Sequence, residues 1–358
     1  MHSLSVNSKK LLDLHWQGAL SEYVTAVAWS PDGQTLAASS AAGEVVLWTA
    51  DLLTKLQESI DQSVDCLAFS RDGQFLAAGG QDGKVKIWRR DPKQTQLIAT
   101  LENAPAWVDK LSWSPTSNQL AFCLGHHVQV WDADAGEVAA TLNFEASSVL
   151  GMSWRPDGQH LAVCGDQGAK VWQALTWDDD PDVLNLPTAS IAIAWSPDGK
   201  YLASGNLDST LTVWEWGFFD PWVMRGFPGK VRSLAWSEPV TPVGASVLAT
   251  ACVEAVVVWE MHSDASVGWD GRLLETHDGV VQAIAFQPST FLLASAADDG
   301  RVCLWQKAKQ VRQILEGAPE GFSCLAWHPQ GHQLATGGQN GDLLIWSKTS
   351  RGQGFGRR

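Results

Sequence analysis

The histidines and carboxylates of this sequence could serve catalysis or metal binding, but they fall into none of the common active-site patterns. There is no GxxxxGK(S/T) phosphate loop, no GxSxG nucleophile turn and no HExxH zinc motif. His126 and His127 are adjacent, so their side chains point apart on a strand. His328 and His332 flank a turn and can approach each other, but no cysteine or carboxylate lies near them at ligand spacing. We therefore predict no catalytic residue, no metal site and no cofactor.

Two further groups of reactive side chains have structural interpretations. Asp178, Asp179, Asp180 and Asp182 form an acidic run without the spaced ligands and glycine of a Ca²⁺ loop, so we predict a solvated loop. The six cysteines form no CxxC pair and lie inside runs that read as strands. We expect reduced, buried thiols that act as small apolar residues.

The net charge of −14 limits the partners of the protein. Such a surface repels phosphate backbones and anionic membranes, so we expect no nucleic-acid partner and no direct membrane insertion. The first residues, MHSLSVNSKKLLDLHWQGAL, lack the apolar core of a signal peptide, and no run is long enough for a membrane span. The expected location is the cytoplasm.

Most of the chain consists of a repeated unit. The unit recurs eight times, and AVAWSPDGQTLAAS from Ala26 is an example of its first half. It consists of an apolar stretch, Ser-Pro-Asp-Gly or a variant, Leu-Ala, a turn, and an alternating run that ends in Trp. The closing tryptophans are 40 to 46 residues apart: Trp48, Trp88, Trp131, Trp172, Trp214, Trp259, Trp305 and Trp346. Each unit reads as two apolar strands around a turn, an alternating third strand and a more variable fourth.

One four-stranded sheet cannot bury both faces, whereas eight sheets packed face to face in a ring can. We predict an all-β, eight-bladed propeller, with seven blades as the alternative. The last blade lacks a fourth strand after Trp346, and Leu12, Leu14 and Trp16 alternate with polar residues. Residues 11–16 are therefore expected to complete it. The prediction is one domain over residues 1–349 and a disordered tail over 350–358.

The unit resembles the Trp-Asp (WD) repeat of β-propellers over nearly the whole chain. It departs from that pattern because Asp follows the closing Trp only at Asp132, and only His277 occupies the place of the family's Gly-His histidine. The resemblance implies one buried hydrogen-bonded set in a single blade, formed by His277, Ser295, Asp298 or Asp299, and Trp305.

Two groups of residues that the repeat does not require are candidate partner-binding sites. The first is an outer aromatic segment, with Trp216, Phe218, Phe219 and Trp222 where other repeats are polar. The alternative is that these rings pack against the outer strand of the next blade. The second lies where the first strands begin, with Tyr23, Trp107 and Lys230 at equivalent places. Propellers similar to this one often bind partners on that face.

Two irregular connections also stand out. Blade six replaces the tight turn with the segment Ser237–Ala245, and Met261–Gly271 lengthens the connection before blade seven. Insertions in repeat arrays usually map to loops, often on a working face.

These observations favour a non-catalytic platform that binds other proteins, whose identity the sequence does not give. One alternative is a subunit that stabilises a larger complex. Another is an enzyme or small-ligand binder that uses the central channel, but this needs clustered carboxylates or histidines on the inner strands. Runs such as AVAW, CLAF, KLSW and SLAW contain none.

Overall fold

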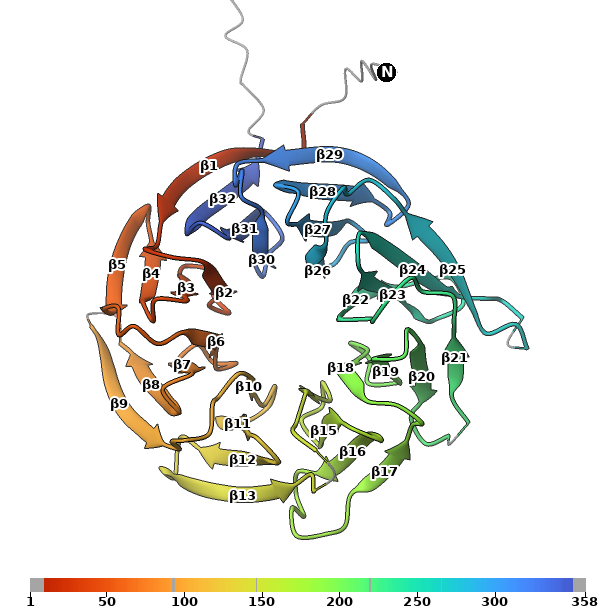
Figure 1. The fold of residues 1–358 in the computed structure, drawn as a ribbon, viewed down its shortest axis with the longest axis horizontal. Coiled ribbons are helices and arrows are strands. Elements are labelled where there is room, and N and C mark those ends of the chain that lie inside the picture. The colour runs from red at the N-terminus through yellow and green to blue at the C-terminus, as the bar shows by residue number, and fades with distance from the viewer. Residues whose placement is uncertain (1–9, 92–93, 146, 219, 265, 350–358) are drawn as a thin grey trace, which may run out of the picture.

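The computed structural model describes residues 10–91, 94–145, 147–218, 220–264 and 266–349. These residues form eight four-stranded antiparallel sheets arranged as the blades of a closed ring (Figure 1), which confirms the predicted propeller and its number of blades. The part of the chain that is described contains no helix that could cross a membrane.

Each blade runs from an inner strand at the central channel to an outer strand at the rim. Blade 1 contains β2 (Val24–Trp29), β3 (Leu36–Ser40), β4 (Val45–Thr49) and β5 (Leu52–Gln57), and blade 2 contains β6 (Val64–Phe69), β7 (Phe75–Gly80), β8 (Lys84–Arg90) and β9 (Thr95–Glu102). Blade 3 contains β10 (Leu111–Trp113), β11 (Gln119–Leu124), β12 (His127–Asp132) and β13 (Glu137–Asn143), and blade 4 contains β14 (Gly151–Trp154), β15 (His160–Gly165), β16 (Gly168–Gln173) and β17 (Asp182–Asn185).

The second half of the ring repeats this order. Blade 5 contains β18 (Ser190–Trp195), β19 (Tyr201–Asn206), β20 (Leu211–Glu215) and β21 (Trp222–Met224), and blade 6 contains β22 (Ser233–Val240), β23 (Ser246–Cys252), β24 (Ala255–Met261) and β25 (Trp269–Leu274). Blade 7 contains β26 (Val281–Phe286), β27 (Leu293–Ala297), β28 (Arg301–Gln306) and β29 (Gln310–Glu316), and blade 8 contains β30 (Phe322–Trp327), β31 (Gln333–Gly338), β32 (Asp342–Lys348) and β1 (Leu12–Ala19).

The N-terminal strand closes the ring, as predicted. β1 pairs antiparallel with β32, with Leu12 opposite Lys348 and Ala19 opposite Asp342, so the strand extends past the expected residue 16. Its side chains do not alternate simply, because the register shifts between Leu14 and Trp16. Figure 1 shows the two coloured ends of the chain side by side in this blade.

Neighbouring blades are joined by tryptophans of the inner strands as well as by apolar packing. In five blades the indole N–H donates to a backbone carbonyl of the preceding blade's inner strand: Trp29 to Ala326 (3.2 Å), Trp113 to Ala68 (3.0 Å), Trp154 to Ser112 (3.1 Å), Trp236 to Ala194 (3.1 Å) and Trp327 to Ala285 (3.1 Å). A net stabilisation of about 0.5–1.5 kcal/mol is typical of one such bond. The inner-strand Trp of the repeat thus links each of these blades to its neighbour.

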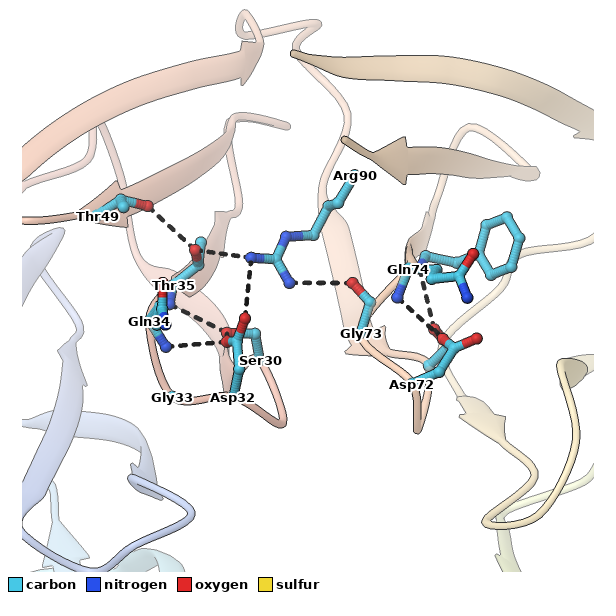
Figure 2. Close-up of polar contacts among 12 residues, drawn as sticks. Ser30, Asp32, Gly33, Gln34, Thr35, Thr49, Asp72, Gly73, Gln74 and Arg90 are labelled. Carbon is cyan, nitrogen blue, oxygen red and sulfur yellow. Dashed lines mark hydrogen bonds and ion pairs between the residues drawn. The ribbon is translucent and has the colours of Figure 1, made fainter. Parts of the chain in front are cut away.

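The Ser-Pro-Asp-Gly turns are fastened by their own side chains. In blade 1 the Ser30 hydroxyl donates to Asp32 (2.5 Å), and the backbone N–H of Gln34 donates to the same carboxylate (3.0 Å). Gly33 has a φ of +72°, a conformation that favours glycine. Blade 2 repeats this network around Asp72 (Figure 2). These turns lie on one face of the ring, which we call the turn face, and the opposite face, where the inner strands begin, is called the entrance face.

Candidate functional site

The entrance face is strongly acidic. Its loops are those that lead into each inner strand and those that join the second and third strands of each blade. Their exposed described carboxylates are Glu22, Glu58, Asp61, Asp109, Glu145, Asp166, Asp208, Glu254, Glu275, Asp278 and Glu320. The exposed described cations of the same loops are Lys110, Arg225, Lys230 and Arg232. Strand cations pair with only two of these carboxylates, Glu58 with Lys55 (2.9 Å) and Asp278 with Arg301 (2.8 Å). The face therefore attracts positively charged groups.

The entrance face also exposes apolar side chains. The side chain of Trp107 is 62% exposed, and Tyr23, Ile60, Leu207 and Val253 are exposed as well. Partial burial raises the pKa of the Tyr23 phenol above its ordinary value. Exposed aromatic rings among charged groups are typical of protein-binding surfaces.

The three residues that the sequence singles out on this face lie on different blades. Tyr23 precedes the inner strand of blade 1, Trp107 that of blade 3 and Lys230 that of blade 6. The other blades carry smaller residues at the same place: Ser63, Ser148, Ala189, Val280 and Gly321. The structure therefore distributes the three around the channel and does not bring them into one cluster.

The outer aromatic segment lies mostly within the protein. The Trp216 ring packs edge-on against Trp195 (ring centroids 4.9 Å apart) and His160 (5.3 Å). The Trp222 ring packs against Tyr201 (6.3 Å) and against Trp269 (6.5 Å), which begins the outer strand of the next blade. Both tryptophans are half-buried, so neither presents a free ring.

Phe218 is the exposed member of this segment. Its side chain is 65% exposed, and Phe219 lies outside the described residues. Phe218 and Trp216 border a hollow of about 230 Å³ together with His160 and Asp182. Burial lowers the pKa of the His160 imidazole, which therefore favours the neutral form. The segment offers one exposed ring beside a small hollow, not a wide aromatic patch.

The structure brings the hydrogen-bonded set of blade 7 together. The two ring nitrogens of His277 lie 3.0 Å from an Asp299 carboxylate oxygen and 2.8 Å from the Ser295 hydroxyl. The Trp305 indole donates to the same hydroxyl (2.8 Å). Asp299, and not Asp298, is the carboxylate of the set. All four side chains hold strands and turns of one blade together, which is a structural role.

The other described histidines and cysteines form no reactive group. The His328 and His332 rings are in tilted contact, with centroids 3.8 Å apart. His328 Nε2 bonds to the Gly33 carbonyl (2.9 Å), and its Nδ1 accepts from the Gln330 N–H (3.1 Å). Among the described residues no group of three or more His, Cys, Asp or Glu could hold a metal ion. Burial raises the pKa of the Cys164 and Cys303 thiols to about 12, so they are protonated at neutral pH.

A polar cleft of about 610 Å³ separates the turns of blades 1 and 2 on the turn face. Arg90 lies in it and donates to the Gly73 carbonyl (3.0 Å) and to the Thr35 hydroxyl (2.9 Å), as Figure 2 shows. Burial alone would raise the pKa of the Asp32 carboxyl, but hydrogen bonds from Ser30 and Gln34 and the Arg90 charge lower it below its usual range. Arg90 thus bridges two blades, a role that the repeat pattern does not indicate.

Taken together, these features define a closed eight-bladed β-propeller with acidic, aromatic-bearing loops on one face. Six segments of the chain match the family model described as WD domain, G-beta repeat: residues 10–49, 51–89, 136–173, 183–215, 266–306 and 309–347. These segments cover more than half of the sequence, so the chain belongs to the WD40 repeat family.

Matches to curated proteins are partial. The chain is 24% identical over 116 residues to the probable cytosolic iron-sulfur protein assembly protein 1 of Vanderwaltozyma polyspora, covering 26% of this chain and 33% of the relative. It is 26% identical over 137 residues to the Protein SEC13 homolog of Drosophila melanogaster, covering 35% of this chain and 38% of the relative. It is 27% identical over 144 residues to the nuclear distribution protein nudF of Emericella nidulans, covering 36% of this chain and 32% of the relative. The chain thus spans about a third of the length of these relatives.

Similarity to solved structures extends over the whole ring. Sqt1 from Chaetomium thermophilum superimposes with a TM-score of 0.82 at 17% identity, covering 94% of this chain and all of that one. Sqt1 of the same organism bound to the N-terminus of the ribosomal protein L10 gives a TM-score of 0.80 at the same identity and coverage. At this level of identity the likeness shows the fold alone.

Proposed function

We propose that this protein is a non-catalytic platform for other proteins, and that its entrance face binds a basic segment of a partner. The observation that carries the proposal is the excess of exposed carboxylates over cations in the loops of that face, with Trp107 exposed among them. Carboxylates attract and orient a basic segment, and an exposed indole supplies apolar contact area and a cation–π partner.

A protein of the same fold also binds a segment of another protein. Sqt1 has been crystallised with the N-terminus of a ribosomal protein, so a ring of this shape can hold a terminal segment of another chain. Tyr23 and Trp107 are the side chains that we expect to contact the partner, and Lys230 is expected to pair with an acidic group of it. The six free cysteines support a reducing compartment, and we propose the cytoplasm.

We favour the platform over the two alternative functions. A permanent subunit would expose a large contiguous apolar patch, whereas Trp216 and Trp222 are half-buried. A channel-site enzyme would need reactive groups on the inner strands. Apart from Asp65 and Glu238, the eight inner strands carry no carboxylate, and they carry no histidine.

A peptide-binding measurement with matched charge reversals tests the proposal. The probe is a fluorescein-labelled peptide of alternating Lys and Ser with one central Tyr, titrated with the purified full chain and followed by fluorescence anisotropy. The double substitution Glu22→Lys, Asp61→Lys should weaken binding about tenfold or more, because it places repulsive charges on the entrance face. Trp107→Ala should also weaken it.

The control makes the same change in net charge elsewhere. Asp178→Lys with Asp180→Lys alters exposed residues of the acidic run between β16 and β17, and is expected to leave the affinity nearly unchanged. Equal weakening by both double variants would mean that the probe responds to net charge alone. That result, or the absence of binding to the unaltered protein, would refute the proposal.

A further inference from the structure

The turn face carries an apolar substitution in blade 7 that the other blades lack. The turn position occupied by Phe291 holds a polar residue in the other blades with a turn of the same length: Gln34, Gln74, Asn118, Gln159, Lys200 and His332. Blade 6 departs from the pattern at the same side, since its longer connection exposes Val240 and Val243. Two neighbouring blades thus place apolar side chains where the repeat places polar ones.

These side chains border two hollows that meet at Phe291. One hollow, of about 440 Å³, is bordered by Leu11, Phe291 and Leu292 and lies between blade 7 and the start of β1. The other, of about 260 Å³, is bordered by Val240, Pro242 and Phe291 and lies between blades 6 and 7. Phe291 and Lys307 border both. We call the combined depression the blade 6–8 groove.

The rim of the groove is positively charged, although the protein as a whole carries a net charge of −14. Among the described residues that border the larger hollow, Lys307 and Arg312 are cations and none is a carboxylate, while Lys309 borders the smaller hollow. Glu260, which borders the smaller hollow, is already paired with Lys309 (3.2 Å) and Arg272 (3.1 Å). The groove therefore combines an apolar floor with cations at its edge.

We propose that the blade 6–8 groove binds an acidic segment of a partner protein that carries an aromatic or large aliphatic anchor. The two hollows fit side chains in size, since binding sites of a few hundred Å³ bury most of a small ligand. The anchor packs against Phe291, and a carboxylate beside it pairs with Lys307, which borders both hollows. This site is on the opposite face from the one under the proposed function and attracts the opposite charge.

The terminal segments of the chain itself do not match the groove in charge. Residues 1–9 and 350–358 contain Lys9, Arg351, Arg357 and Arg358 and no Asp or Glu. Like charges would repel them from a rim of Lys307, Lys309 and Arg312. Charge complementarity therefore points to a separate acidic chain as the occupant.

The test uses a labelled peptide of alternating Glu and Ser with one central Phe, titrated with the full chain at physiological ionic strength. Lys307→Glu should weaken binding at least tenfold by reversing a rim charge. Phe291→Gln should weaken it comparably, and it installs the residue that three other blades carry at this position, so the fold should tolerate it. Lys200→Glu, the same type of charge reversal at the blade 5 position that corresponds to Phe291, is the control and should change little.

Several results would overturn the proposal. The first is that a probe with Ser in place of Phe binds as tightly as the original probe. The second is that Lys200→Glu weakens binding as much as Lys307→Glu does. The third is that the unaltered protein does not bind the probe. If deletion of residues 350–358 strengthens binding of the probe, the chain's own C-terminal segment occupies the groove. If the protein is a dimer and Phe291→Gln abolishes the dimer, a second copy of the chain occupies the groove. The variant Glu22→Lys, Asp61→Lys should leave this affinity unchanged, so failure of the entrance-face proposal is distinguishable from failure of this one.

Discussion

At the scale of single residues, the blades differ in the hydrogen bonding of the buried indole N–H of the closing tryptophan. In blade 7, Trp305 and His277 share the Ser295 hydroxyl. In blade 8, Trp346 donates to Thr336 (3.2 Å) and no histidine takes part. In blade 1, Trp48 Nε1 is buried without a hydrogen-bond partner. The ring is buried in all three blades, whereas its hydrogen bonding differs. Packing of the closing tryptophan is therefore common to these blades, and the polar set of blade 7 adds to it.

The Ser295→Ala variant measures what the complete set contributes. The substitution leaves one nitrogen of His277 and the indole N–H of Trp305 buried without this partner, which should lower the free energy of unfolding by about 1–3 kcal/mol. Thr336→Val is the matched control, because it removes the partner of one indole only and should cost less. Denaturant unfolding followed by tryptophan fluorescence gives both values. A larger loss for Thr336→Val would contradict the assignment.

At the scale of the elements, β1 is the strand that turns a row of sheets into a ring. The Gln313 side chain of blade 7 accepts from the Leu11 N–H (2.7 Å) and donates to the Leu12 carbonyl (2.6 Å), so β1 is tied to two blades. The Thr349 hydroxyl adds a bond to Asp13 (2.8 Å). A strand held on both sides of the seam protects the edge of β32 from pairing with other chains.

Two leucines of β1 provide a prediction with an internal control. Leu12 is 2% exposed and packs in the core between blades 7 and 8, whereas Leu14 is 47% exposed. Leu12→Ala should lower the free energy of unfolding by about 2–5 kcal/mol, as is usual for a buried leucine. Leu14→Ala should cost much less. Thermal and denaturant unfolding test this, and equal losses would show that β1 contributes through its backbone pairing alone.

The pattern of β1 also shows where sequence reasoning stops. Leu12, Leu14 and Trp16 alternate with polar residues, which was sufficient to predict the closing strand. The register shift between Leu14 and Trp16 interrupts that alternation, and a bulge leaves no mark in a pattern of apolar residues. Which leucine is buried therefore had to come from the structure.

At the scale of the whole molecule, the ring was predictable and its surfaces were less so. Each unit repeats the same strands and turns, so the blade number and the closure follow from counting. Trp216 contacts His160 and Trp222 contacts Trp269, and both of these partners belong to neighbouring blades. The local sequence pattern does not predict such contacts. The cleft in which Arg90 lies is likewise formed by residues of two blades, so the pattern of a single repeat does not predict it. Phe291 did leave a signal, because its turn position is polar in six other blades.

The two proposed sites lie on opposite faces of a ring whose blades are packed together, so we expect them to act independently. The basic and the acidic probe should bind at the same time, each with an affinity that changes less than about twofold when the other is saturating, because neither touches the other's residues. Titration of one probe in the presence of the other measures this. Competition between them would mean that both occupy one site, or that they bind each other in solution.

The seam of blade 8 has a consequence for how the protein is made. Asp13 and Thr349, which bond across the seam, are separated by 336 positions in the chain. During synthesis β1 leaves the ribosome before every other strand of the ring, and its partner β32 is the last of them. Seven blades can assemble in turn from neighbouring strands, whereas the eighth waits for the final one. A ribosome that stalls before β32 therefore leaves β1 without the strand with which it pairs.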